Sequence, residues 1–202
     1  MMILRSSPAS PFVRKVRIGI ALLGLESRVE LRETNLADPA DPIEQQNPLG
    51  KIPVLLREDG SALLDSRVIL EYLDHLAGGG RIVPHDPAVR FPALALQALC
   101  DGALDASILV VYEGRYRPAE MRVQSWVDRQ AGKVDRALAA IEAAPPPLGD
   151  VPHVGHIALA CLLGYRDLRF EPTWRSTYPR LNAWHDAFAA AVPAFAATAA
   201  PR

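Results

Sequence analysis

The spacing of apolar positions in residues 11–23 predicts an amphipathic helix. Val13, Val16, Ile20 and Leu23 recur at helical intervals and form one stripe. Ser10-Pro11 before this stripe suits an N-cap and the first helical position, and Gly24 suits the end of the helix. Between the apolar positions lie three cations, and we expect them on the opposite, polar face: Arg14, Lys15 and Arg17.

Short apolar runs before and after this helix predict strands. Residues 2–5 precede it, and residues 28–33 follow it with alternating character, which together indicate a β-α-β unit with parallel strands. Residues 52–56 and 61–64 flank the turn-rich segment Arg57-Glu58-Asp59-Gly60, which predicts a β-hairpin. Asp65-Ser66 then caps a further helix that buries Ile69, Leu73 and Leu76. This order of elements is thioredoxin-like.

After about residue 80 the pattern becomes purely helical. Gly78-Gly79-Gly80 and Pro84-His85-Asp86-Pro87 indicate a linker, so we expect an α/β domain over 1–80, a linker over 81–87 and an all-helical domain over 88–202. We expect helices over about 90–116, from Pro118 to about 143, and from Tyr178-Pro179 onward. Residues 153–166 are apolar on nearly every face and should form the centre of the helical domain. The stripe expected to be buried in the second helix is Val123, Val127, Val134, Leu138 and Ile141.

Composition narrows the functional classes. The chain has 202 residues, 50% hydrophobic and 22% charged, with a net charge of −1. This balance gives no electrostatic attraction to nucleic acid or to an anionic membrane. The longest uninterrupted apolar stretch, residues 157–163, is too short to cross a bilayer, and the first residues lack a signal-peptide core. Cys100 and Cys161, the only cysteines, lie in apolar helical contexts and are interpreted as buried thiols of a cytoplasmic protein.

Three motifs of the first domain resemble those of glutathione transferases. Residues 10–17, Ser-Pro-Phe-Val-Arg-Lys-Val-Arg, resemble the serine-type active-site start of that family. Residues 47–55, Asn-Pro-Leu-Gly-Lys-Ile-Pro-Val-Leu, resemble its glutathione-binding loop, and residues 65–73 resemble its acidic-residue-plus-serine motif. Near the other end, residues 178–184 are similar to the last main helix of the family. The resemblance covers essentially the whole chain.

Ser10 is the candidate catalytic residue. A hydroxyl at a helix N-terminus can donate to an anion, and the helix dipole favours a thiolate there. By resemblance, the nucleophile is the sulfur of glutathione and Ser10 stabilises its thiolate. The simpler alternative is that Ser10 only caps the helix. Because serine stands where glutaredoxin-like relatives have cysteine, a mixed disulfide with the protein is not expected at this position.

The resemblance also implies the residues that hold glutathione. Lys51 would bind the glycyl carboxylate, unless it is an ordinary solvated lysine. The bond before Pro53 is expected to be cis, in a strand at the edge of the sheet, with the backbone of Ile52 facing the peptide ligand; a trans proline at a strand end is the alternative. Asp65 would bind the α-ammonium group and Ser66 the α-carboxylate of glutathione, whereas a purely capping role is equally compatible with these two residues.

The helical half gives weaker signals. Asp101, Asp105, Ile108, Tyr112 and Arg115 share one helix face. Phe12, Tyr112 and Arg115 are candidates for the second-substrate pocket, although Tyr112 and Arg115 would also suit a surface or a dimer contact. His153 and His156 stand where relatives carry a Ser/Thr cap and an Asp, which puts the usual capping box in doubt; they suit a cap better than a metal site. His75, His85 and His185 are expected on the surface.

The sequence therefore predicts a homodimeric glutathione transferase that uses glutathione as co-substrate, without a metal, against a small electrophile. Conjugation, addition–elimination and reduction of a peroxide all remain open. The rival hypothesis is a non-catalytic binding or adaptor protein of the same fold.

Overall fold

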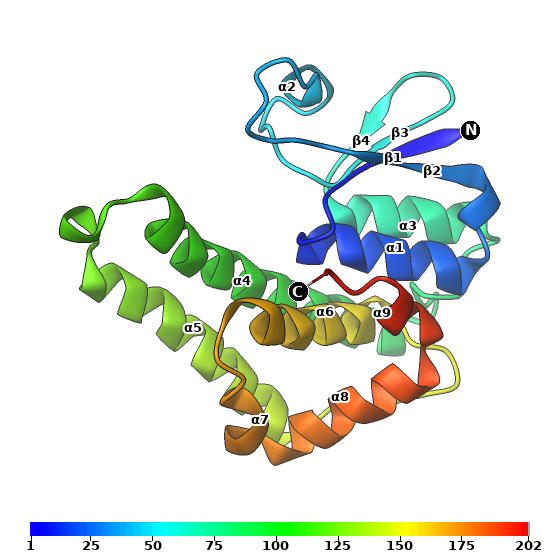
Figure 1. Cartoon of the computed structure of the whole chain (residues 1–202). Coiled ribbons are helices and arrows are strands. Elements are labelled where there is room, and N and C mark those ends of the chain that lie inside the picture. The colour runs from blue at the N-terminus through cyan, green and yellow to red at the C-terminus, as the bar shows by residue number, and fades with distance from the viewer. Residues whose placement is uncertain (202) are drawn as a thin grey trace.

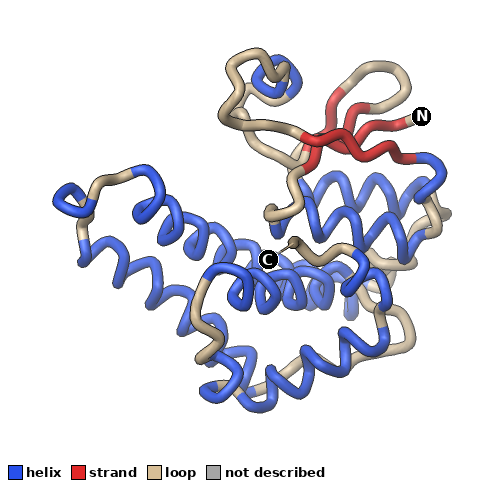
Figure 2. Tube along the Cα trace, viewed as in Figure 1, coloured by secondary structure: helices blue, strands red, loops and turns tan. Residues whose placement is uncertain are grey.

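A computed structural model describes residues 1–201, and its first part is a small sheet backed by two helices. The strands are β1 (Met2–Ser6), β2 (Val29–Glu33), β3 (Val54–Leu56) and β4 (Ala62–Leu63), in the order β2-β1-β3-β4. β1 and β2 are parallel, with Leu4 opposite Leu31, and β3 is antiparallel to both β1 and β4. The predicted β-α-β unit and hairpin are therefore confirmed. Figure 2 shows the strands confined to one corner of an otherwise helical molecule.

Two helices cover one face of this sheet. They are α1 (Pro11–Leu23) and α3 (Ser66–Leu76), which pack against each other below the strands (Figure 1). Ser10 and Asp65 are their N-caps, as predicted, and α1 ends at Gly24 in a left-handed conformation with φ of 70°. The 3₁₀ turn η1 (Glu26–Arg28) leads into β2, and the short helix α2 (Ile43–Gln46) lies in the long connection between β2 and β3.

The rest of the chain is helical. α4 (Pro87–Tyr116) and α5 (Gln124–Ala143) form a long antiparallel pair joined through η2 (Ala119–Met121), and α6 (Val154–Arg169) packs against α4. Every residue from Val154 to Leu163 is buried, so the predicted central helix is confirmed. α7 (Trp174–Thr177), α8 (Pro179–Ala191) and α9 (Pro193–Ala197) follow, with Leu181, Trp184 and Phe188 inward as expected.

The two parts are joined by a packed segment. Ile82 and Val83 are buried, and the Asp74 carboxylate accepts the backbone N–H groups of Gly80, Arg81 and Ile82 at 2.8–3.0 Å. At the other end of the chain, Arg14 of α1 donates to the Phe195 carbonyl at 2.6 Å and stacks over its ring. The C-terminus therefore lies at the junction of the two parts, as Figure 1 shows.

Several expectations about burial are wrong. Lys15, expected on a polar face, is completely buried because α4 supplies a carboxylate partner there. His185, expected on the surface, is only 6% exposed because it packs edge-on against Trp174 and Phe195. Val123 is exposed because it precedes α5, which begins six residues later than expected.

The long helix α4 is apolar along much of its length. By length and composition alone it could cross a membrane. In the structure it packs lengthwise against α5 and α6, with residues such as Cys100, Ala103 and Leu104 buried. Its apolar character is therefore that of a core helix.

Candidate functional site

Ser10 stands at the N-terminus of α1, where the sequence places it. Its Oγ accepts the backbone N–H of Val13 at 3.2 Å, so the capping role is present. Because that contact uses a lone pair of the oxygen, the hydroxyl hydrogen stays available, and within residues 1–201 it has no acceptor. Ser10 is partly exposed and lines a small hollow together with Tyr165 and Leu168 of α6. The hydroxyl can thus cap the helix and donate to an anion at once.

The second predicted site residue, Ser66, contacts a buried cation. The Lys15 ammonium group donates to Ser66 Oγ at 3.1 Å and to both oxygens of Asp101 at 2.6 and 2.8 Å. Lys15, Ser66 and Asp101 come from α1, α3 and α4, so this contact joins three elements far apart in sequence. Burial raises the pKa of Asp101, and the ammonium of Lys15 opposes that rise. Because Asp101 balances the charge of Lys15, it is the N-terminus of α3 itself that favours an anion beside Ser66.

Asp65 is half exposed beside this network. It caps α3 by accepting the Arg67 N–H at 2.9 Å, and its carboxylate pairs with the Arg67 guanidinium at 2.9 Å. Burial would raise the pKa of Asp65, but the hydrogen bonds from Arg67 outweigh that and hold the pKa below its usual value. Asp65 is therefore an anion that faces solvent and can accept an ammonium group.

A tight loop presents Lys51 and Ile52. The buried Asn47 side chain accepts the Leu49 N–H at 3.0 Å and donates to the Lys51 carbonyl at 2.7 Å, with Gly50 at a φ of 59° between them. Lys51 itself is exposed, and its ammonium group has no carboxylate partner in residues 1–201. Asn47 is a positioning residue that the sequence analysis did not single out, although it begins the quoted motif.

The bond between Ile52 and Pro53 is cis, as predicted. The expected edge position is wrong, because β3 pairs with β1 on one side and β4 on the other. Pro53 is accommodated because it precedes the first paired residue, Val54, and so removes no hydrogen bond from the ladder.

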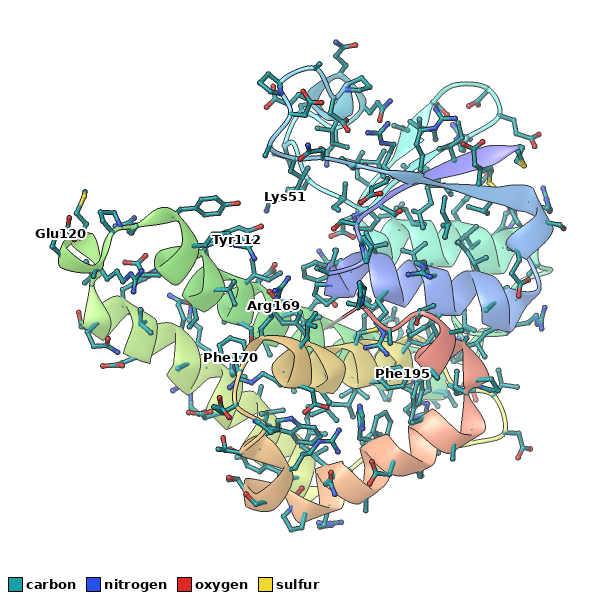
Figure 3. The ribbon with its side chains drawn as sticks, viewed as in Figure 1. Lys51, Tyr112, Glu120, Arg169, Phe170 and Phe195 are labelled. Atoms are coloured by element: carbon teal, nitrogen blue, oxygen red, sulfur yellow. The ribbon has the colours of Figure 1, made fainter. Side chains whose placement is uncertain are left out.

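Further polar side chains lie where the two parts of the molecule face each other. Figure 3 shows Lys51 from the loop before β3 and Tyr112 from α4 pointing toward one another, with Arg169 of α6 nearby. Burial raises the pKa of Tyr165 on α6, and the charge of the Arg169 guanidinium and its hydrogen bond to the Tyr165 hydroxyl oppose that rise. Tyr165 and Arg169 were missed in the sequence because they lie in an otherwise apolar helix without a motif.

Phe12 and Asp101 both lie near the buried ammonium group of Lys15. Phe12 packs against the core, with the Lys15 ammonium group 5.7 Å from its ring centroid. Asp101, which shares a helix face with Tyr112 in sequence, is buried against Lys15. Lys15 joins Ser66 of α3 to Asp101 of α4, and Figure 3 shows Lys51 and Tyr112 facing each other across the boundary between the two parts.

Comparison with known proteins decides the family. Residues 4–81 match the family model for the glutathione S-transferase N-terminal domain, and residues 124–187 match that for the C-terminal domain. The uncharacterized GST-like protein YibF of Escherichia coli K12 is 34% identical over 87% of both chains. The chain belongs to the glutathione S-transferase family.

Solved structures of glutathione transferases agree with this fold. A glutathione transferase family member from Pseudomonas fluorescens Pf-5, with bound glutathione, is 41% identical and superposes with a TM-score of 0.93 over 100% of both chains. A second structure of a family member from that bacterium, with bound S-(propanoic acid)-glutathione, is 40% identical with a TM-score of 0.88 over 100% of both chains. The thioredoxin-like and helical parts predicted from the sequence are thus confirmed as those of this transferase family.

Both cysteine thiols of this transferase family member are buried, although Cys161 lines the same hollow as Ser10. Cys100 and Cys161 are both buried and unpaired. Burial raises the pKa of the Cys100 thiol and raises that of Cys161 to about 12. Since a thiol reacts as its thiolate, neither side chain can act as a nucleophile at neutral pH.

Proposed function

We propose that this protein is a glutathione transferase that binds glutathione as a thiolate and transfers it to an electrophilic small molecule. The observation that carries the proposal is the Ser10 hydroxyl, whose hydrogen is free at the N-terminus of α1 beside the groups expected to hold the tripeptide. In this proposal residues 1–80 hold glutathione, residues 88–202 shape the second-substrate pocket, and residues 81–87 join them.

The charges around Ser10 suit the ends of glutathione. Asp65 offers a carboxylate to the α-ammonium group, and Ser66, with Lys15 behind it, offers a hydroxyl and a helix N-terminus to the α-carboxylate. Lys51 faces Tyr112 across the boundary between the two parts and can bind the glycyl carboxylate. These contacts place the cysteinyl sulfur near Ser10, where donation from the hydroxyl and the dipole of α1 favour the thiolate over the thiol.

The reaction then needs no nucleophile from the protein. The glutathione thiol loses its proton to solvent, and the sulfur forms a bond to an electrophilic carbon while a leaving group departs with its electron pair. A protein mixed disulfide is not available, since serine occupies position 10 and both cysteines are buried. Reduction of a peroxide by bound glutathione would use the same thiolate. The neighbour with bound S-(propanoic acid)-glutathione supports a pocket that accepts a substituent on sulfur.

The test is the titration of bound glutathione in wild type and Ser10→Ala. We expect the thiol pKa of the complex, followed by thiolate absorbance, to rise by about one to two units in the variant, as loss of one hydrogen bond to a charged acceptor predicts. Conjugation at neutral pH should slow in parallel, whereas glutathione affinity should change little.

Ser7→Ala is the matched control, because Ser7 lies in the same loop but caps no helix. It should leave the titration unchanged. Superimposable curves for wild type and Ser10→Ala would show that Ser10 is a cap and nothing more. Retention on immobilised glutathione without turnover of any electrophile would favour the non-catalytic adaptor instead.

We further propose that the protein is a cytoplasmic homodimer. Apolar side chains are exposed on the outer faces of α3 and α4, including Val68 at 47% and Phe91 at 66%. Between these helices a hollow of about 490 Å³ is lined by Val68, Tyr72 and Val83, with the Arg90–Glu71 ion pair at its rim. A second copy can cover this face. Phe91→Glu should then halve the molar mass measured by light scattering, and a monomeric wild type would contradict the proposal.

A further inference from the structure

Ala200, close to the C-terminus, lines the same hollow as Ser10. The other residues of this lining come from the turn before α1, from α1 itself and from α6, and they are mainly apolar, with Pro11 and Leu168 among them. Figure 1 shows the last residues of the chain near the start of α1. Since Ser10 is the residue proposed to contact the glutathione sulfur, Ala200 borders the space beside the proposed position of that sulfur.

Arg14 of α1 holds the segment that leads to Ala200. Its guanidinium donates to the Phe195 carbonyl at 2.6 Å and to Thr198 Oγ1 at 3.4 Å, and it lies 3.9 Å from the centroid of the Phe195 ring. Gly164 of α6 leaves room for this contact, because a Cβ there would lie 2.5 Å from an Arg14 nitrogen and 3.3 Å from the Phe195 ring. Phe195 and Thr198 are both buried. The C-terminal segment is therefore anchored on the helix whose N-cap is Ser10.

The residues after Thr198 are attached less firmly. The Ala199 N–H donates to the Ala196 carbonyl at 3.1 Å, the Ala200 N–H has no hydrogen-bond partner in residues 1–201, and Pro201 has no N–H to donate. Ala199 and Pro201 are exposed, whereas Ala200 is half-buried against the hollow. Residues 199–201 can therefore move away without breaking the anchor at Phe195 and Thr198.

The hollow is small while residues 199–201 lie against it. Its volume is about 10 Å³, roughly the least space that one water molecule needs. The apolar lining suits a hydrocarbon group, and a group of about methyl size already fills the space. A longer group can enter only if Ala200 gives way, because Pro11 and Leu168 belong to packed helices.

We propose, on the basis of the transferase function above, that residues 199–201 limit the size of the apolar group next to the glutathione sulfur. Ala200 is the specificity-determining contact, and Arg14 is the positioning residue that keeps it there. The favoured second substrate is then an electrophile with a short alkyl group at its reacting carbon. With an iodoalkane, the S–C bond forms and the C–I bond breaks, iodide leaves with the electron pair, and the alkyl group remains on sulfur in the hollow.

S-methylglutathione and S-butylglutathione give a matched test, since they share the tripeptide and differ only in the length of the group on sulfur. Calorimetry compares their Kd values. Deleting residues 199–202 should shift the ratio of the two Kd values about tenfold in favour of S-butylglutathione, because the longer chain gains room for apolar contact. Ala200→Leu should weaken S-butylglutathione about tenfold relative to unmodified glutathione. Neither change should alter the affinity for unmodified glutathione.

Ala199→Leu is the matched control, because Ala199 is adjacent in sequence, exposed and outside the lining of the hollow. It should keep the wild-type ratio of Kd values. Arg14→Gln removes the guanidinium that holds Phe195 and should shift the ratio in the same direction as the deletion. Arg14→Lys keeps a cationic donor for the Phe195 carbonyl and should restore part of the wild-type ratio.

Iodomethane and 1-iodobutane extend the test to turnover. The quantity compared is the rate enhancement, kcat/KM divided by the uncatalysed rate constant with glutathione. The enhancement for 1-iodobutane relative to that for iodomethane should rise about tenfold in the deletion variant and stay unchanged in Ala199→Leu. A shift in the Kd ratio without turnover of either reagent would support the size limit and contradict only the transferase proposal.

Two results would overturn the inference. An unchanged Kd ratio in both the deletion variant and Ala200→Leu would show that the group on sulfur does not contact the C-terminal segment. A loss of affinity for unmodified glutathione as large as the change for the conjugates would show that the segment supports the tripeptide site instead.

Discussion

The ammonium group of Lys15 and the carboxylate of Asp101 form an ion pair inside the protein, where Lys15 is completely buried and Asp101 is 6% exposed. This ion pair connects α1, whose N-cap is Ser10, to α4, which contains Tyr112 and Arg115. Lys15 also donates to Ser66, so the same cation supports the N-terminus of α3. One shared contact therefore positions the candidate glutathione residue Ser66 and the helix that carries the candidate pocket residues Tyr112 and Arg115.

Removing one member of this pair should destabilise the fold strongly. Lys15→Met leaves a buried carboxylate without its cation, and we expect the free energy of unfolding in urea to fall by about 3–5 kcal/mol. The double variant Lys15→Met/Asp101→Leu should lose less than the sum of the single variants, because it leaves no uncompensated charge. Additive losses of under about 1 kcal/mol each would show that the pair carries little of the stability.

Asp65→Ala and Ser66→Ala should each weaken glutathione binding by about 1–3 kcal/mol, because each removes a contact to a charged end of the tripeptide. The loss of stability should be smaller, about 1 kcal/mol for a missing cap or donor partner. Calorimetry measures the affinity and thermal unfolding the stability.

Asp86→Ala is the matched control for these two variants, since Asp86 caps α4 by accepting the Ala88 N–H at 2.9 Å. It should lose comparable stability and no glutathione affinity. If Asp65→Ala and Ser66→Ala also kept full affinity, their role would be capping alone.

His153 and His156 should make the helical part sensitive to acid. They form the capping box of α6 that the sequence put in doubt: His153 Nδ1 accepts the N–H groups of Gly155 and His156, and His156 Nδ1 accepts that of His153. The two rings stack 3.6 Å apart. Burial lowers the pKa of His153, and it lowers that of His156 to about 4.

Because the folded state holds these imidazoles neutral, their contribution is complete above about pH 6.5 and is lost as the pH falls toward 4. We expect the free energy of unfolding to decrease by about 1–3 kcal/mol over that interval. His153→Ser/His156→Asp restores a conventional box and should flatten this decline, whereas His75→Asn, on an exposed residue, should leave it unchanged. An identical decline in the Ser/Asp variant would assign the acid sensitivity to other groups.

The Arg5–Asp41 pair should control glutathione affinity from a distance. Arg5 in β1 is 4% exposed and donates to both Asp41 oxygens at 2.5 and 2.6 Å and to Thr34 at 2.9 Å. Asp41 also accepts the Ile43 N–H at 3.0 Å, so the pair ties the segment that leads to Lys51 onto the sheet. Asp41→Ala should speed amide hydrogen exchange in residues 35–50 and weaken glutathione binding several-fold.

Arg32→Gln serves as the control for Asp41→Ala, because Arg32 pairs only with Glu30 on the surface of β2. It should change neither exchange nor affinity. Faster exchange with unchanged affinity would show that the segment does not position Lys51.

Local patterns in the sequence determine much of this structure. Ser10-Pro11 and Asp65-Ser66 predict the starts of α1 and α3, because a helix cap depends on residues within one turn. The hairpin of β3 and β4, the buried centre of α6 and the candidate glutathione residues follow from equally short motifs. The capping role of Ser10 and Asp65 was likewise predictable, since it needs no distant partner.

Contacts between distant residues decide the rest. Lys15 has the sequence signature of a surface cation, and only Asp101, 86 residues away, makes its burial favourable. His185 is buried because α7 and α9 bring Trp174 and Phe195 against it. Tyr165 lines the same hollow as Ser10 only because α6 packs against α1. The sequence alone determined the capped starts of α1 and α3 and the buried centre of α6; the tertiary structure decided which charges are paired, because pairing depends on which helices meet.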